Sequence, residues 1–281
     1  MRILTDSACD LPLAYLQQHE VTFFSLRVEL DGHDYADITD IQAPSIYEAL
    51  RLGKEPKTSQ VSPDAFYETF EQMAKNGEEG VYIAFSSALS GTYATAVMMY
   101  EQVKESYPQF ILHIIDSKSA SLGQGLVVQE AVRVKESGAT LDELVAHITA
   151  FAPRVEHIFV VDDLQHLARG GRISKSTAFV GGLLNIKPIL EISKEGKIES
   201  LDKARGQKRA IKQMIAYMKE RGVNLQQQMI GLLHCADDAL LQELKQAIEA
   251  EFQPKGFVES NVGAVISSHV GLGTFAVFFE S

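Results

Sequence analysis

The first half of the chain alternates short runs of β-branched and aromatic residues with segments whose apolar side chains recur every three or four positions. Residues 81–85, VYIAF, have the length of a buried strand, whereas residues 63–75 repeat Phe66, Phe70 and Met73 along one face of a helix. Strands that alternate with helices are typical of βα units around a mostly parallel sheet. We therefore predict an α/β fold here, with further strands at 1–7 and 110–116 and further helices at 10–19, 92–107 and 119–138.

Turn and capping residues mark the ends of several of these elements. Asp31-Gly32 has the composition of a two-residue hairpin turn and lies within the β-rich residues 21–37. Thr140 and Glu143 have the spacing of a capping box, in which each side chain hydrogen-bonds the backbone of the other residue. We therefore expect a helix to begin at this point and to cover residues 141–151.

The pattern changes after Pro153 and predicts a second α/β domain with a mixed sheet. We place the boundary between the domains within residues 151–154, which gives domains at 1–152 and 153–281. This boundary is approximate, and the two domains could exchange segments. Residues 188–204 read as a hairpin that turns at Glu195-Gly196. The other elements expected in this half are strands at 155–161 and 228–234, helices at 207–222 and 237–252, and two final strands.

Residues 261–279, NVGAVISSHVGLGTFAVFF, form a long and nearly uncharged stretch. A membrane-spanning helix needs about 20 mostly apolar residues, and this stretch is interrupted by polar residues, including Asn261 and His269, and by three glycines. We therefore expect two buried strands joined by a glycine-rich turn and no membrane span.

Composition and charge narrow the classes of partner. The chain has 281 residues with 26 Lys and Arg against 37 Asp and Glu, a formal net charge of −11, so contacts to the phosphates of DNA or RNA would face general repulsion. Its two cysteines, Cys9 and Cys235, have no metal-ligand spacing and suit a reducing compartment. Because of the negative net charge, we expect no nucleic-acid partner. Residues 1–30 lack the pattern of a signal peptide, so we expect a cytoplasmic protein.

Small hydroxyl residues gather where strands of the predicted sheet end. They lie at residues 5–7, 58–59, 86–92 and 116–117. The carboxyl ends of strands in an open α/β sheet share one edge, where ligands usually bind, so we expect these groups to converge. Within SSALSGTY, Ser90 and Gly91 fall at a helix N-terminus, where free backbone N–H groups favour an anion. Helix capping alone is the alternative explanation for Ser90.

Ser90 could also be a nucleophile, but the motif around it is not the one that this chemistry uses. A nucleophilic serine of this kind sits in a G-x-S-x-G elbow with a base within hydrogen-bond reach, whereas here the sequence is ALSGT. The chain also contains no Walker A motif, no G-x-G-x-x-G and no H-E-x-x-H, so we expect neither a metal nor a nucleotide cofactor. The hydroxyl and amide groups suit holding an anion better than transforming one.

Six motifs follow one another in order along the whole chain: ILTDSACDLP, KTSQVSP, SSALSGTYATA, DSKSASLGQG, LARGGRIS and HVGLGTFAVFF. In this order and spacing they resemble the DegV family of bacterial fatty-acid-binding proteins. The resemblance implies two α/β domains that enclose one long-chain fatty acid, with no catalysis by this chain. It further implies that a separate fatty-acid kinase phosphorylates the carboxylate while the carrier holds the acyl chain.

The resemblance also implies which residues hold the fatty-acid carboxylate. Thr58 and Ser90 would donate hydrogen bonds to it, with the Gly91 backbone N–H as a further donor. His269 and Arg172 match positions expected close to the head group, although a core histidine is the alternative for the former. The family often carries proline in the glycine turn after this histidine, whereas this chain has Leu272, so the geometry of that turn is left open.

Two further groups of residues have both a functional and a structural interpretation. Arg169, Arg172 and Lys175 could form a basic patch that docks the kinase or steers the acyl phosphate, or they could belong to a solvated loop. Several apolar residues could line a tunnel for the acyl tail, with ordinary core packing as the alternative for each. They are Phe159, Phe179, Leu183, Leu184, Ile186, Ile189 and Ile192.

The leading hypothesis is a cytoplasmic carrier that buries a fatty acid and presents its carboxylate to a kinase. Burying about 15 methylenes at about 0.8 kcal/mol each would contribute about 12 kcal/mol before the costs of association. The tail would therefore supply affinity, and the head-group site would supply orientation. A serine hydrolase or acyltransferase that uses Ser90 is the second hypothesis, and a regulatory or structural protein with an empty cleft is the third.

Overall fold

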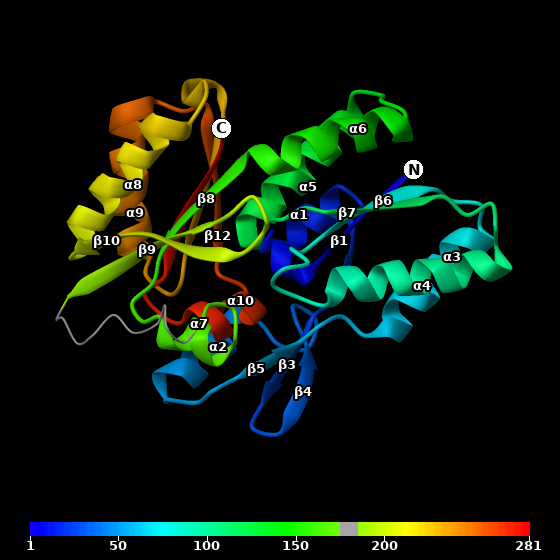
Figure 1. Ribbon diagram of the computed structural model, residues 1–281, viewed down its shortest axis with the longest axis horizontal. Helices are drawn as coiled ribbons and strands as arrows, with labels where there is room; N and C mark the ends of the chain where they lie inside the picture. Colours follow the sequence, from blue (N-terminus) through cyan, green and yellow to red (C-terminus); the bar gives the residue numbers. More distant parts are fainter. Residues whose placement is uncertain (175–184) are drawn as a thin grey trace.

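The N-terminal part of the chain forms a parallel sheet, as the alternation of strands and helices predicts. The computed structural model describes residues 1–174 and 185–281 (Figure 1). Four parallel strands lie in the order β2-β1-β6-β7. Their bounds are Arg2–Asp6 for β1, Thr22–Phe24 for β2, Gly80–Ala84 for β6 and Leu112–Asp116 for β7.

Helices cover both faces of this sheet. Alternate residues of a strand point to opposite faces: Leu4 and Tyr82 pack with α3 and α4, whereas Ile3 and Val81 pack with α5 and α6. This burial on both faces explains why the strands read as unbroken apolar runs. The helices are α1 (Leu13–Gln18), α3 (Pro63–Lys75), α4 (Thr92–Ser106), α5 (Ser121–Glu136) and α6 (Leu141–Phe151).

A small antiparallel sheet, in the order β4-β3-β5, projects from this layer (Figure 1). The predicted hairpin turn is present between β3 and β4, and both Asp31 and Gly32 have positive φ, at 54° and 77°. Strand β5 was not predicted, because three residues are too few to show alternation. The bounds are Arg27–Leu30 for β3, His33–Ala36 for β4 and Lys57–Ser59 for β5, with α2 (Ala43–Arg51) between the last two.

The C-terminal part forms the predicted mixed sheet, six strands in the order β10-β9-β8-β13-β11-β12. Helices α8 (Gln207–Arg221) and α9 (Asp238–Phe252) cover one face, and α5 contacts the other (Figure 1). The strands are β8 (Val155–Val160), β9 (Ile186–Ile192), β10 (Ile198–Arg205), β11 (Met229–His234), β12 (Gly256–Asn261) and β13 (Phe275–Glu280).

The prediction of two strands within residues 261–279 is wrong, because only β13 is a strand there and Ala264–Val270 forms helix α10. The helix packs against α2 and α7 (Gln165–Arg169) and is buried around most of its circumference, so it shows no polar stripe of helical period. Ser267 and Ser268 are buried within it, and both donate their hydroxyls to the Ala264 carbonyl.

Three short 3-10 helices complete the part of the chain that the structure describes. Their bounds are Ser7–Cys9 for η1, Ala152–Arg154 for η2 and Leu225–Gln227 for η3.

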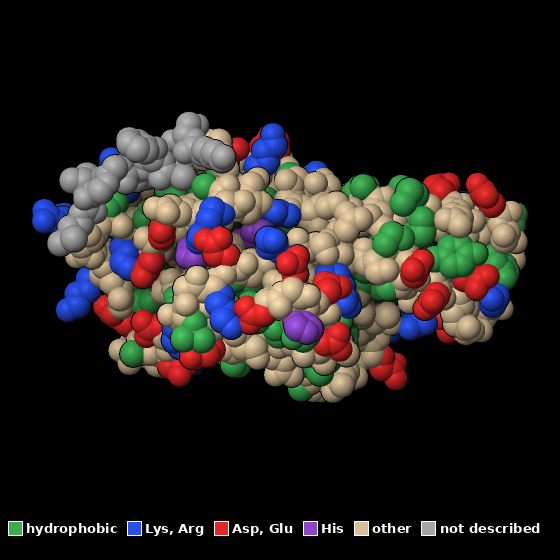
Figure 2. Space-filling view, turned by 90° about the horizontal axis from the view of Figure 1, so that it is seen from below, with side chains coloured by type: hydrophobic (Ala, Val, Ile, Leu, Met, Phe, Trp, Pro, Cys, Tyr) green, Lys and Arg blue, Asp and Glu red, His purple; other side chains and the backbone are tan. Residues whose placement is uncertain are grey.

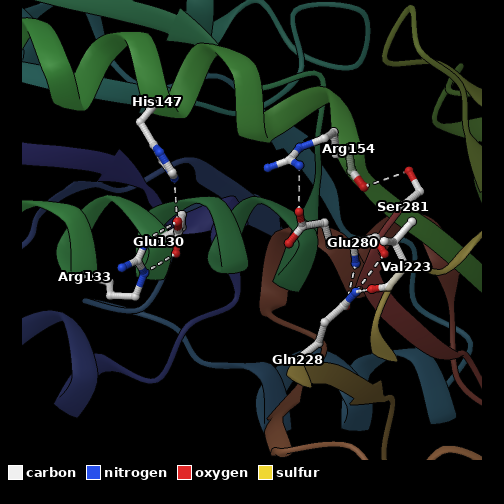
Figure 3. Close-up of polar contacts among 8 residues, drawn as sticks. All are labelled: Glu130, Arg133, His147, Arg154, Val223, Gln228, Glu280 and Ser281. Atoms are coloured by element: carbon white, nitrogen blue, oxygen red, sulfur yellow. Dashed lines mark hydrogen bonds and ion pairs between the residues drawn. The ribbon is translucent and has the colours of Figure 1, made fainter. Parts of the chain in front are cut away.

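Contacts from two other segments of the chain hold the end of the C-terminal strand (Figure 3). The Gln228 side chain accepts from the Glu280 backbone N–H at 2.8 Å and donates to its carbonyl at 2.9 Å, as an adjacent strand would. The Arg154 guanidinium lies 2.9 Å from the Glu280 carboxylate, and the Arg154 carbonyl accepts from the Ser281 backbone N–H. This strand is therefore held at its last residue as well as along its ladder.

Glu130 joins α5 to α6 beside this strand (Figure 3). Its carboxylate lies 2.7 Å from the Arg133 guanidinium and 2.6 Å from His147 Nε2. Burial favours a higher pKa for Glu130, but the hydrogen bonds from Arg133 and His147 outweigh it and lower the pKa below its ordinary value. The carboxylate is thus held in its charged form at neutral pH.

The face of the molecule seen from below in Figure 1 mixes charges of both signs. Figure 2 shows Lys and Arg side chains interspersed with Asp and Glu across it, with histidine side chains among them. Within residues 1–174 and 185–281, none of the helices has the length and apolar character needed to cross a bilayer.

Candidate functional site

A mostly apolar cavity, called the main cavity below, lies against one face of the six-stranded sheet, with β5, the loop after β6 and helix α10 forming its other walls. Its empty volume is about 760 Å³, counting the space at its mouth. Among the residues expected to line a tail tunnel, Phe159 and Ile192 line it, whereas Ile189 is buried against α8 and α9 on the other face of its sheet and Ile186 is not part of the wall. Phe179, Leu183 and Leu184 lie outside the described residues.

Five polar side chains gather at one end of this cavity: those of Thr58, Ser59, Ser90, Arg172 and His269. They come from β5, from the loop before α4, from the loop after α7 and from α10. The rest of the wall is apolar except for Ser121, His157 and Thr274. The cavity therefore has one polar end and a mostly apolar body, which is the polarity of an amphiphile.

Thr58 and His269 are joined across 211 positions of sequence. Thr58 Oγ1 lies 2.6 Å from His269 Nε2. Burial, and to a smaller degree the positive charge of Arg172, lower the pKa of His269 to about 4, so its ring is neutral at neutral pH. With the proton on Nε2, the ring donates to Thr58 Oγ1 and leaves the threonine hydroxyl free to donate to a ligand.

The other side of the His269 ring packs against a glycine. A Cβ atom on Gly170 would lie 2.1 Å from Nδ1, so a larger residue there would displace the ring. Nδ1 has no hydrogen-bond partner among the residues that the structure describes. In the following turn Gly271 and Gly273 have φ of 76° and 72°, and Leu272 packs against the core between them. The turn is thus formed without the proline that is frequent at this point in the DegV family, which the sequence motifs resemble.

Ser90 lies two residues before α4, whose N-cap is Gly91, and it lines the cavity while its hydroxyl also contacts the first backbone N–H of the helix. Ser90 Oγ accepts from the Thr92 backbone N–H at 3.2 Å and lies 2.9 Å from Thr92 Oγ1. Gly91 does not line the cavity, but a Cβ atom there would lie 2.1 Å from Gln60 Oε1, which explains the glycine. The capping explanation and a ligand-facing position are therefore compatible for Ser90.

Among the residues that the structure describes, none is placed as a catalytic base for Ser90. Within the described residues its hydroxyl contacts Thr92, and the imidazole at this end of the cavity, His269, is bonded to Thr58 instead. A serine nucleophile needs a base within hydrogen-bond reach. The site as formed suits holding an anion.

Arg172 brings a positive charge to the polar end. Its Nε donates to the Leu89 carbonyl at 3.0 Å, and burial lowers the pKa of its half-buried guanidinium. Arg169 does not line the cavity and pairs with Glu55 at the surface. Lys175, the third cation of the expected basic patch, lies outside the described residues. Of the two that the structure describes, Arg172 lies beside the cavity and Arg169 does not.

Two of the four hydroxyl-rich strand ends serve the fold instead of the cavity. Asp6 is fully buried and accepts from the Phe85 backbone N–H at 2.9 Å and from the Tyr82 hydroxyl at 2.7 Å. Asp116 accepts from the Ser87 backbone N–H at 3.1 Å and pairs with Lys118. Both carboxylates hold the loop after β6, from which Ser90 follows.

The sequence patterns did not single out three polar residues of the cavity wall: Ser121, His157 and Thr274. His157 lies within the apolar run of β8 and carried no motif. In the described part of the chain, no group of three or more His, Cys, Asp or Glu side chains is arranged to hold a metal ion, and Cys9 and Cys235 are free and buried.

The whole chain matches one protein-family model and several solved structures. The model, described as "Uncharacterised protein, DegV family", matches residues 1–281. A DegV domain-containing protein of Clostridium perfringens is 38% identical over 281 residues, covering 99% of this chain and 96% of that protein. A structure described as fatty acid binding of a DegV family protein from Thermus thermophilus is 30% identical, with a TM-score of 0.90 and full coverage of both chains.

A second solved structure carries a similar description. It is a stearic acid-binding protein from Eubacterium ventriosum, 26% identical, with a TM-score of 0.89 over 99% of this chain and 98% of that one. The fold predicted for both halves is therefore confirmed, and so is the resemblance carried by the six motifs. This chain belongs to the DegV family.

Proposed function

We propose that this chain binds one long-chain fatty acid, with the acyl chain in the apolar cavity and the carboxylate at its polar end. The observation that carries the proposal is the polarity of that cavity, whose body is mostly apolar and whose one end gathers five polar side chains. The relatives from Thermus thermophilus and Eubacterium ventriosum, described as binding fatty acids, support it.

Thr58, Ser90, Gly91, His269 and Arg172 are the proposed carboxylate site. A buried carboxylate costs several kcal/mol unless donors replace its water. The hydroxyls of Thr58 and Ser90 and the guanidinium of Arg172 are donors of this kind, and His269 orients the first of them. The Gly91 N–H, at the start of α4, would add the favourable field of a helix N-terminus.

The carrier role goes one step further. We propose that the two domains, 1–152 and 153–281, enclose the acid in the cytoplasm and present its carboxylate to a separate fatty-acid kinase. The chain itself would catalyse no reaction, because the proposed site holds an anion and no described residue is placed as a base for Ser90.

Organic extraction of the purified protein followed by mass spectrometry tests ligand binding. A long-chain fatty acid should co-purify, and a delipidated sample should take it up again. Ser90→Ala should weaken this uptake, whereas Ser87→Ala, an exposed serine of the same loop, is the matched control. A protein that neither carries nor takes up a fatty acid would contradict the proposal.

The kinase step is tested separately. Acyl phosphate should form from the loaded carrier, ATP and a fatty-acid kinase, and should not form when either protein is omitted. A serine-directed activity probe tests the competing hydrolase hypothesis: labelling that Ser90→Ala abolishes would favour a nucleophile and overturn the carrier role.

A further inference from the structure

A small polar crevice adjoins the apolar end of the main cavity. It has an empty volume of about 310 Å³, counting its mouth, and Ser119, His157 and Ser193 are among the residues that line it. His157 and Ile192 line both the crevice and the main cavity, so these two side chains form the wall between them. The crevice is therefore within reach of a ligand in the cavity.

Ser119, Ser193 and His157 bring buried polar atoms to this crevice, beside the charged side chains of Lys118, Glu156 and Lys194. Ser119 Oγ, Ser193 Oγ and the ring nitrogens of His157 have no hydrogen-bond partner of normal distance and angle among the described residues, and the ring has only a weaker contact with the Val155 backbone. Most buried polar atoms in folded proteins are hydrogen-bonded, and an unpaired one is costly. These atoms indicate that a further hydrogen-bonding group belongs beside the two serines and the His157 ring.

The His157 ring is fixed in place by its neighbours. It packs edge-on against Phe278, with ring centroids 5.5 Å apart at 84°, and a Cβ atom on Gly123 would lie 2.1 Å from Nε2. Burial lowers the pKa of His157 to about 4, so the ring is neutral at neutral pH and offers one donor and one acceptor. A hydroxyl group matches this pair of functions.

The pairing of β8 with β13 puts His157 far from the carboxylate site. Phe278 lies opposite His157, whereas Thr274, just before β13, lines the cavity near the α10 turn. Four residues of strand separate Thr274 from Phe278, which is about 13 Å at about 3.3 Å per residue. A group that met His157 would therefore sit on the distal part of an acyl chain.

We infer that the cavity selects fatty acids that carry a hydroxyl or oxo oxygen on the distal part of the chain, with His157, Ser119 and Ser193 as the residues that recognise this oxygen. The inference rests on the proposed fatty-acid binding and specifies its substrate class. A plain methylene chain would leave the polar atoms of the crevice unpaired.

An ordered water molecule is the competing occupant, because buried waters typically bond to about three polar groups. The two differ in a measurable way. A water would pair the crevice whatever the chain carries, so a hydroxyl would be disfavoured at every position along the tunnel. Recognition of a ligand oxygen favours one distal position only.

Competitive loading tests this difference. The delipidated protein is incubated with octadecanoic acid and a set of monohydroxyoctadecanoic acids that carry the hydroxyl at successive positions, and the retained acids are quantified by mass spectrometry. Retention should peak at one distal position, at least about tenfold above the isomers hydroxylated near the carboxylate, a difference of about 1.4 kcal/mol. His157→Phe should remove this peak, whereas Phe159→Leu, its matched control in the same wall, should change the retention of all isomers together.

Each other outcome counts against the inference. A hydroxyl disfavoured equally at every position in the unmodified protein, with octadecanoic acid still retained, would overturn it and leave fatty-acid binding intact. A distal peak that survives in His157→Phe would remove His157 from the recognition site. Retention of no acid at all would overturn the proposed function and this inference together.

Discussion

His269 should make the stability of the ligand-free protein depend on pH in a direction that its burial dictates. Its pKa is lowered from 6.5 to about 4 in the folded state, so between these values the unfolded chain binds a proton that the folded chain does not. Stability contributed by the neutral ring is therefore complete above about pH 6.5 and is lost as the pH falls towards 4. A shift of about 2.5 units corresponds to at most about 3.4 kcal/mol.

Other buried groups act in the same pH range, so a single pH curve cannot isolate His269. The pKa of His157 is also lowered to about 4 by burial, which adds a loss of the same sign. Burial raises the pKa of Asp37 to about 7, so its contribution is present below its ordinary pKa and is lost as the pH rises towards 7. The difference between two proteins that share these groups removes both effects.

The comparison is between the unmodified chain and His269→Gln, whose amide can still reach Thr58. Urea denaturation of both ligand-free proteins at a series of pH values gives the free energy of unfolding of each. From pH 7 to pH 4 the variant should gain up to about 3.4 kcal/mol relative to the unmodified chain. Two curves that stay parallel would refute the assignment of His269 as a buried neutral ring.

Three further changes test the site and its supports. Ser90→Ala should weaken fatty-acid binding by about 1–3 kcal/mol, measured by titration of the delipidated protein, and unchanged affinity would remove it from the carboxylate site. Glu130→Gln should lower the free energy of unfolding by about 1 kcal/mol at neutral pH, because it weakens the hydrogen bonds from His147 and Arg133 to this side chain. The difference in unfolding free energy should shrink at acid pH, because the Glu130 carboxylate of the unmodified protein becomes protonated as the pH falls to its lowered pKa. A difference that does not change with pH would contradict the role of this charge. Gly123→Ala should cost about 1–3 kcal/mol in thermal unfolding, because its Cβ would lie 2.1 Å from the rigid His157 ring, and an unchanged melting temperature would show that the ring can move.

The sequence was informative wherever a local signal decides the structure. The Asp31-Gly32 turn and the Thr140–Glu143 capping box are both present, because each depends on contacts between residues close in sequence. Helix α10 was predicted as strand because burial on most sides removes the polar stripe that shows helical period. Such a helix is defined by what surrounds it, which lies in distant segments.

In the candidate site, too, features set by neighbouring residues could be predicted, and features set by distant segments could not. Ser90 could be placed near a helix start from its own motif, and the structure puts its hydroxyl beside the Thr92 N–H. The hydrogen bond between Thr58 and His269 joins β5 to α10, and no pattern in the sequence around either residue indicates it. His157, in the apolar run of β8, carried no signal, because nothing in the sequence shows which face of that strand adjoins the cavity.

The large sequence separation of Thr58 and His269 also determines when this end of the cavity can form during synthesis of the chain. A ribosome that adds about 5 to 20 residues per second needs about 10 to 40 seconds to make the 211 residues between them. During that interval the nascent chain exposes Thr58 and the apolar side chains beside it without the second wall of the cavity. A newly made chain therefore completes this end of the cavity only when synthesis is almost finished, and until then the apolar side chains beside Thr58 stay exposed to aggregation and to chaperones.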